Sequence, residues 1–386
     1  MRKSTLIRKC KESLSGVLAT LMITGSFVMP VSATQEKPQE IKVESVKDSV
    51  SIQKLDGIEH NYKDYLDSSV MFKLPDSVKD DQDISVIVTV DTADVMSAYE
   101  NSDKTMNFTE YALQSNEAEA IRNQIAVKKA AMLSALDEMS VDYSTGEDYS
   151  AVLSGFELVI KARDFEATCQ ALGDGMDVIV GEEYLPAETK LVENTVNVFD
   201  TGIFDSSDSE YDGSGMVVAV LDTGLDSNHT AFSPKNFTSE KLGLTYDDVA
   251  SLVKKTKASE LVDGLTVDDV YINDNVPYGF DYADNDADVY STHNNHGTHV
   301  SGIIVGNDDT IRGVAPNAQL VSMKIFSDVM DTSRTAWILA ALEDCVVLGV
   351  DVINMSSVLH ADSAARPTRK QSAEYSIRSV PQVSIW

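Results

Sequence analysis

A short apolar run that stops at a carboxylate constrains the fold of this chain most strongly. Residues 216–221 read Met-Val-Val-Ala-Val-Leu, and Asp222, Thr223 and Gly224 follow directly. A continuous apolar run of this length is typical of a strand buried on both faces of a parallel sheet. Open α/β sheets carry their chemistry at the carboxyl ends of the strands. We therefore expect Asp222 to lie in a functional cleft.

Histidines gather in one later segment. Three of the six, His293, His296 and His299, fall within seven residues. Gly297 directly after His296 lets the backbone pack closely against a neighbouring element. This layout suits a histidine at the N-terminus of a helix with its ring aimed into the cleft. We expect His296 to take that position and His299 to pack nearby.

Zinc and aspartic protease chemistry both fit these residues poorly. His296 and His299 are three positions apart without a glutamate between them, whereas zinc metalloproteases pair their histidines four apart around a glutamate. Aspartic proteases use two Asp-Thr-Gly loops, and this chain repeats that triplet at 200–202 and 222–224. In single-chain aspartic proteases, however, the two loops come from separate lobes, and the surroundings here read as α/β.

Three segments together resemble the subtilisin-like serine proteases (subtilases, peptidase S8). Residues 218–224 are similar to the family's Asp motif, 296–302 to its His motif and 349–356 to its substrate-binding strand. The acidic character and the long insert between the first two motifs resemble the secreted, cell-envelope branch. The resemblance implies the first half of a subtilisin-like doubly wound parallel sheet over residues 205–356, and serine endopeptidase activity.

The resemblance also implies roles for single residues. His296 would be the general base, while Asp222 would hold its other ring nitrogen and stabilise the imidazolium. The backbone near Ser356 would pair with an extended protein or peptide substrate by strand addition. This chemistry requires no cofactor. The carboxylate-rich residues 278–288 could bind a structural calcium ion, or form a solvated acidic loop, and they lack the spacing of an EF-hand.

The N-terminus predicts export. Residues 1–33 combine a basic start, an apolar stretch and small residues before the expected cleavage, as a signal peptide does; a membrane anchor is the alternative. After cleavage we expect a secreted or cell-envelope protein without a stable membrane span. Residues 34–82 read as a polar linker. Cys169 and Cys345 fall on separate expected helices, so no disulfide framework is predicted.

Residues 83–190 are predicted to form a separate module. Strands are expected at 84–90, on both sides of Gly155 within 149–160, and at 176–180, with helices at 117–136 and 164–172. The order β-α-β-β-α-β is the ferredoxin-like arrangement. This α+β module resembles the propeptide inhibitor domain of subtilases, which implies a zymogen processed near residues 188–212; a generic α+β module is the alternative.

The family pattern stops after Ser356. Residues 357–386 form a divergent tail, and no Gly-Thr-Ser-Met-Ala nucleophile motif occurs in the sequence. We expect a truncated and inactive fragment, with a change of reading frame after Ser356 as its origin; a variable C-terminus is the other explanation. Without the nucleophile no acyl-enzyme can form.

The net charge of the chain limits the kinds of molecule that it can bind. The net charge of −31 disfavours nucleic acid, because phosphate binding needs a basic surface. Two functions stay open. The chain is a secreted subtilisin-like endopeptidase precursor that lacks its serine, or a non-catalytic secreted inhibitor or folding partner of a related protease.

Overall fold

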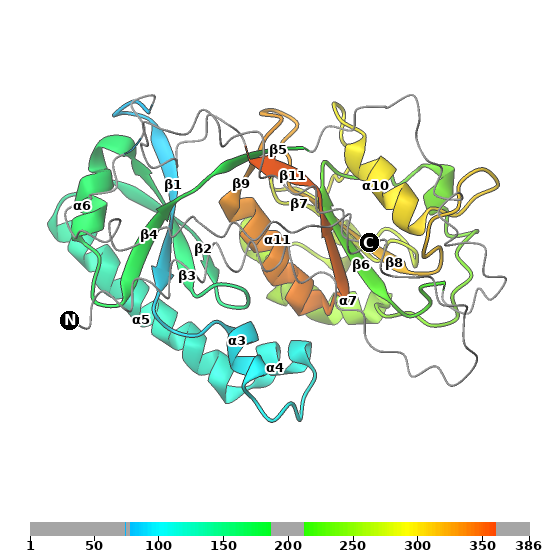
Figure 1. Cartoon of the computed structure of the whole chain (residues 1–386), viewed down its shortest axis with the longest axis horizontal. Coiled ribbons are helices and arrows are strands. Elements are labelled where there is room, and N and C mark those ends of the chain that lie inside the picture. Colours follow the sequence, from blue (N-terminus) through cyan, green and yellow to red (C-terminus); the bar gives the residue numbers. More distant parts are fainter. Residues whose placement is uncertain (1–73, 75–77, 187–211, 360–386) are drawn as a thin grey trace, which may run out of the picture.

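The computed structural model describes residue 74 and residues 78–186 and 212–359. The predicted signal peptide, most of the linker, the processing region and nearly all of the divergent tail lie outside these residues. The described chain forms two parts side by side, joined by a small third sheet (Figure 1). None of the helices in the described residues has both the length and the apolar character needed to cross a bilayer.

The first part is an antiparallel sheet backed by helices. Its strand order is β2-β3-β1-β4, and the elements are β1 (Asp83–Val90), α3 (Val95–Glu100), α4 (Phe108–Gln114), α5 (Asn116–Glu138), β2 (Tyr143–Tyr149), β3 (Gly155–Lys161), α6 (Phe165–Gln170) and β4 (Met176–Val180). The predicted helix at 117–136 is present as α5, and its buried side chains include Ile121, Ile125, Met132 and Leu136.

One strand prediction in this part was wrong. Residues 150–154 form a connection, and the strand before it is β2, at 143–149. The apolar side chains Ala151, Val152 and Leu153 misled the prediction, because they are buried without belonging to a strand. Their backbone turns instead toward the second part of the molecule.

The second part is a parallel sheet with helices on both faces, as the sequence predicted. The strand order is β10-β6-β8-β7, and the elements are β6 (Val217–Asp222), β7 (Tyr278–Asp281), α10 (His296–Val305), β8 (Gln319–Lys324), α11 (Thr335–Leu348) and β10 (Val352–Met355). Alternate side chains of β6 point to opposite faces of the sheet. Val218 and Val220 pack in one apolar cluster with α10, whereas Ala219 and Leu221 pack in the other with α11.

The insert between β6 and β7 packs against the core of the second part. It contains three short helices, α7 (Tyr246–Leu252), α8 (Lys257–Leu261) and α9 (Val267–Val270). Thr245 and Thr266 each begin a helix with a capping box, a local signal that sequence reading missed. Each helix buries at least one small apolar side chain, so the insert belongs to the core around α11.

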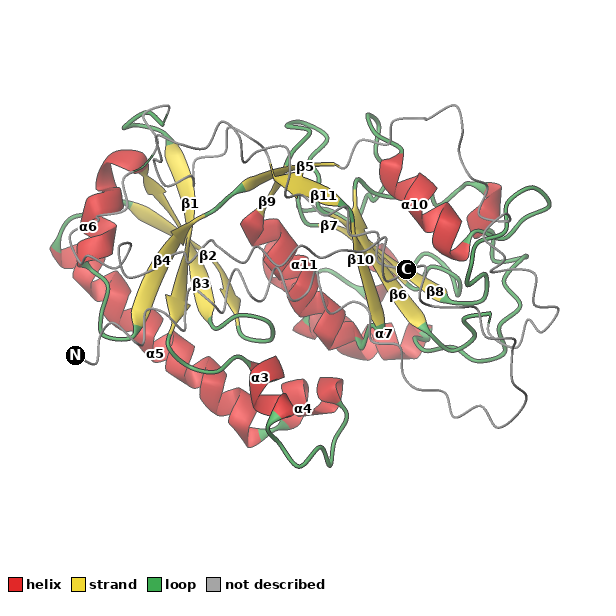
Figure 2. Cartoon of the chain, in the orientation of Figure 1, coloured by secondary structure: helices red, strands yellow, loops and turns green. Residues whose placement is uncertain are grey.

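A three-stranded sheet joins the two parts. Strand β5 (Glu183–Pro186) follows the first part and lies antiparallel between β9 (Ser333–Arg334) and β11 (Ser357–Leu359). Leu185 is the register partner of Val358, and Pro186 that of Ser357. An extended segment of the first part is therefore paired on both sides by strands of the second (Figure 2).

Candidate active site

Asp222 and His296 meet at the carboxyl end of the parallel sheet. Asp222 is the last residue of β6 and His296 the first residue of α10. The His296 Nδ1 atom lies 2.7 Å from Asp222 Oδ1, and the two side chains are 7% and 1% exposed. The same carboxylate oxygen accepts a hydrogen bond of 2.7 Å from the backbone N–H of Thr223. The structure thus brings together the two residues that the sequence had singled out.

Two glycines and a threonine allow the close approach of α10 to β6. A Cβ atom on Gly297 would overlap the carbonyl oxygen of Gly224, so no larger residue fits there without a shift. Gly224 itself has a φ of +115°, a conformation that favours glycine. The Thr223 hydroxyl accepts from the N–H of Gly297 at 2.9 Å and donates to the carbonyl of Asn294 at 3.1 Å. Thr223 therefore fastens the start of α10 to the end of β6.

The electrostatics of the pair favour a charged imidazole. The hydrogen bond to Asp222 raises the pKa of His296 above its ordinary value, although burial acts in the opposite direction. When Nδ1–H donates to the carboxylate, Nε2 is the nitrogen left to accept a proton. The arrangement suits a general base that takes a proton at Nε2.

Ser356 is placed beside this pair by the strand register. Met355 on β10 is the partner of Leu221 on β6, so Ser356 is the next residue at the edge where Asp222 lies. Its hydroxyl donates to Asn354 Oδ1 at 3.3 Å. Strand β11 begins at Ser357 and pairs with β5. Ser356 therefore connects β10, which pairs with β6, to β11, which pairs with β5.

The other histidines of the cluster lie apart from the pair. His293 and His299 are exposed, so the expectation that His299 packs nearby was wrong. Among the described residues, no group of three or more His, Cys, Asp or Glu side chains is arranged to hold a metal ion.

The carboxylate-rich residues 278–288 are buried at their start and exposed at their end, where Asp284, Asp286 and Asp288 form a solvated acidic loop. The aromatic residues of β7 are buried, and Asp281 is 2% exposed and paired with Lys324. Burial raises the pKa of Asp281 to about 6, while Lys324 acts in the opposite direction. Sequence reading missed Lys324, because the strand 319–324 that it ends also contains the polar residues Gln319 and Ser322 and so gives no clear apolar run.

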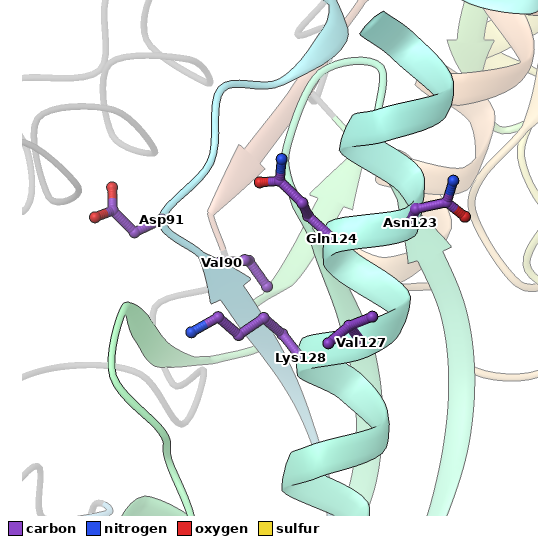
Figure 3. A pocket seen from close by; sticks show the side chains of 6 residues that line it. All are labelled: Val90, Asp91, Asn123, Gln124, Val127 and Lys128. Carbon is purple, nitrogen blue, oxygen red and sulfur yellow. The ribbon is translucent and has the colours of Figure 1, made fainter. Parts of the chain in front are cut away.

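Neither the two described cysteines nor the surface hollow in the first part lies at the His296–Asp222 pair. Cys169 and Cys345 are free, and Cys345 is buried in α11, as a small core residue should be. A surface hollow lies between β1 and α5 in the first part, away from His296 (Figure 3), and is lined by Val90, Asp91, Asn123, Gln124, Val127 and Lys128.

Comparison with known proteins identifies the second part. The model of the subtilase family (peptidase S8) matches residues 213–378. This part of the chain is a subtilase segment. The PII-type proteinase of Lactococcus lactis subsp. cremoris is 32% identical over 285 residues, which cover 71% of this chain and 14% of that protein. The C5a peptidase of Streptococcus pyogenes serotype M18 is 35% identical over 153 residues, covering 37% of this chain and 12% of the peptidase.

The subtilase segment also has solved structures to compare with. The chain spans 13–14% of the length of the Lactococcus lactis proteinases that it matches. Fervidolysin from Fervidobacterium pennivorans, a keratinolytic enzyme related to subtilisin, aligns with a TM-score of 0.42 and 14% identity, over 75% of this chain and 38% of fervidolysin.

Proposed function

We propose that this chain carries two of the three catalytic groups of a secreted or cell-envelope subtilisin-like serine endopeptidase, in precursor form. The observation that carries the proposal is the buried contact of 2.7 Å between His296 Nδ1 and Asp222 Oδ1, at the carboxyl end of a parallel sheet. Its substrates would be proteins or peptides. The relatives are called proteinases and peptidases, which supports this choice.

In the proposed mechanism His296 acts as the general base. Its Nε2 would take the proton of a serine hydroxyl as that oxygen attacks the scissile carbonyl, and would return it to the leaving amine. Asp222 would keep Nδ1 protonated and stabilise the imidazolium that forms. Because both side chains are buried, their attraction is screened little by water and salt.

Peptide recognition in this proposal uses main-chain pairing. Strand β5 lies between β9 and β11 in the manner that an extended substrate would, with its residues in antiparallel register to both neighbours. Strand addition gives affinity through backbone hydrogen bonds. The segment that begins at Ser356 would thus form one wall of the peptide-binding site.

The first part would be a ferredoxin-like propeptide module that inhibits the site in cis. The element order β-α-β-β-α-β and the antiparallel strand order support this assignment. A second contact also supports it. Oε1 of the buried Glu343 on α11 accepts backbone N–H groups from Ser150, Ala151 and Val152, at 3.1, 2.7 and 3.2 Å. The module would therefore be held both at the substrate site and on α11.

We further propose that the 386-residue chain cannot complete acyl transfer. Its sequence contains no Gly-Thr-Ser-Met-Ala motif, so His296 has no serine of that motif to activate. Loss of an oxyanion donor alone typically lowers kcat by roughly 10²–10³-fold. The chain would hold a base and its orienting carboxylate without a nucleophile.

The test is an activity assay on the purified 386-residue chain, with casein as substrate and a fluorophosphonate probe for activated serine. The proposal expects neither turnover nor labelling. Labelling that disappears in His296→Ala would show that a serine within these residues completes the site, and would overturn the proposed inactivity while supporting the protease assignment.

A second candidate is a non-catalytic inhibitor or folding partner of a related protease. The occupied position between β9 and β11 favours it, because a chain that keeps this position filled never binds substrate. It predicts that residues 83–190 fold alone and inhibit a subtilase in trans. An absence of inhibition by a folded 83–190 fragment would rule it out.

A further inference from the structure

A buried lysine lies next to the His–Asp pair and has no part in the proposed proton transfer. Lys324 ends β8 and is the register partner of Asp222 on β6. Its side chain is 1% exposed, and its ammonium group contacts Asp281 and lies 3.3 Å from Asp284 Oδ2 and 3.6 Å from Asp328 Oδ2. We call Lys324 and these three carboxylates the Lys324 cluster.

The Lys324 cluster organises the turn that follows β8. Asp284 Oδ2 accepts the backbone N–H of Asp328 at 2.8 Å, and Asp284 Oδ1 accepts the hydroxyl of Ser327 at 2.7 Å. Two backbone N–H groups, those of Ala283 and Asp284, in turn hold Asp281 Oδ1 at 2.9 and 3.0 Å. Asp328 is thus fixed through both its backbone and its carboxylate.

From Asp328 a line of hydrogen bonds runs to the backbone of His296. Asp328 Oδ1 accepts the hydroxyl of Ser291 at 3.0 Å. The Ser291 oxygen accepts the N–H of Asn294 at 3.2 Å, and Asn294 Oδ1 accepts the N–H of His296 at 2.9 Å. Three successive bonds therefore connect the carboxylate of Asp328 to the first residue of α10.

The start of α10 is anchored by side chains from outside the helix. Its N-cap, Asn295, makes no side-chain hydrogen bond to the helix, so the usual local anchor of a helix start is not used. Thr223 holds the segment from the β6 side, and Ser291 holds it from the β8 side. The two anchors together set where the ring of His296 lies relative to Asp222.

We propose that Ser291 and Asp328 are positioning residues for His296: the Lys324 cluster holds residues 291–295 and thereby keeps the imidazole in its hydrogen bond with Asp222. The catalytic meaning of this role rests on the proposed function, but the positioning itself does not depend on turnover. A buried ion cluster could also serve stability alone, and the experiment below separates the two roles.

The experiment is an NMR titration of His296 in the full 386-residue chain, with its signal assigned by loss in His296→Gln. Ser291→Ala is the decisive variant because it breaks the line without changing any charge. In this variant the pKa of His296 is expected to fall toward its ordinary value of 6.5, because the hydrogen bond to Asp222 loosens. Asp328→Asn should shift the midpoint in the same direction.

The control is Ser251→Ala, which removes an exposed hydroxyl bonded to its own helix α7 at Asp248. It should leave the His296 titration unchanged. Thermal melting of each variant reports global stability separately. If Ser291→Ala and Asp328→Asn both titrate like the unaltered chain, whatever their melting temperatures, the positioning role is wrong. Because no substrate is used, that result would leave the protease assignment untouched.

Discussion

At the scale of single residues, two opposing effects act on His296. Burial disfavours the charged imidazole, whereas the hydrogen bond from Nδ1 to Asp222 favours it, and the hydrogen bond prevails. The carboxylate is also held by the N–H of Thr223, which limits its rotation. The proton affinity of His296 therefore reports directly on whether Asp222 is in place.

The first prediction concerns Asp222→Asn. Removing the charge leaves the burial, so the pKa of His296 should drop and end near or below its ordinary value of 6.5. Since the folded-state pKa is raised in the unaltered chain, the stability it contributes is full below about pH 6.5 and is lost as the pH rises through the folded-state value. NMR titration gives the midpoint, and urea unfolding from about pH 5.5 to about pH 8 gives the stability. An unchanged midpoint would contradict the account.

Sequence reading found Asp222 and His296 because each stands out locally. Asp222 interrupts an apolar strand, and His296 precedes a glycine in a cluster of histidines. The supporting residues were not found, because their roles depend on contacts between distant segments. Ser291 and Asp328, for example, are 37 positions apart and meet only once β8 is in the sheet.

At the scale of elements, the approach of α10 to β6 decides the geometry of the site. Gly297 and Gly302 lie on the same helix in opposite circumstances. A Cβ at Gly297 would overlap the backbone of Gly224, whereas a Cβ at Gly302 would meet no atom within 4 Å. The chain thus supplies its own control for the effect of one added methyl group.

The second prediction compares Gly297→Ala with Gly302→Ala. The first should lower the free energy of unfolding by about 1–3 kcal/mol, because the helix must move away from β6. The second should leave it unchanged or raise it by up to about 1 kcal/mol, because alanine is the better helix former. Urea unfolding of the full chain measures both. Equal effects of the two substitutions would refute the steric argument.

Elements with a clear apolar period were predictable, and short ones were not. Helix α5 and strand β6 follow their patterns closely. The strands β5, β9 and β11 have two to four residues each and exist through pairing between distant parts of the chain. The helices of the insert each bury few side chains and therefore show no clear apolar period. Their predictable feature was the capping box that begins at Thr245 and at Thr266.

At the scale of the whole molecule, carboxylates gather where the first part meets the second. Glu147 on β2 lies 3.4 Å from Lys257 on α8, and the same ammonium is 2.9 Å from Glu260. Glu343 on α11 faces the backbone of residues 150–152 close by. The ammonium group of Lys257 therefore pairs with two carboxylates, of which Glu147 is largely buried and Glu260 is exposed.

The third prediction is a pH dependence of this contact. Burial, together with Glu260, raises the pKa of Glu147 to about 7, and burial also raises that of Glu343. Because the pKa of Glu147 is raised on docking, docking takes up a proton: the contribution is full below the ordinary value of 4.5 and is lost as the pH rises through about 7. The two parts should hold together less well at pH 8 than at pH 6.

Hydrogen exchange at the amides of residues 150–152, corrected for intrinsic rates, measures this docking in the full chain. Protection should fall from pH 6 to pH 8, and Glu147→Gln should flatten the change. Glu240→Gln, at an exposed position in the insert, is the matched control and should keep the full dependence. Constant protection over this range would contradict the prediction.

The placement of β5 between β9 and β11 has a consequence for selectivity and for handling of the protein. Without β5, the edges of β9 and β11 would face each other across an empty strand position, and each edge would present unpaired backbone groups. Under the proposed function, main-chain pairing would give affinity for any extended polypeptide, and selectivity would have to come from pockets for alternate side chains. An empty gap would also invite self-association, since unpaired strand borders template further strands. The pairing of β5 with both neighbours covers these strand edges, and under the proposed function it would also keep other proteins out of the site.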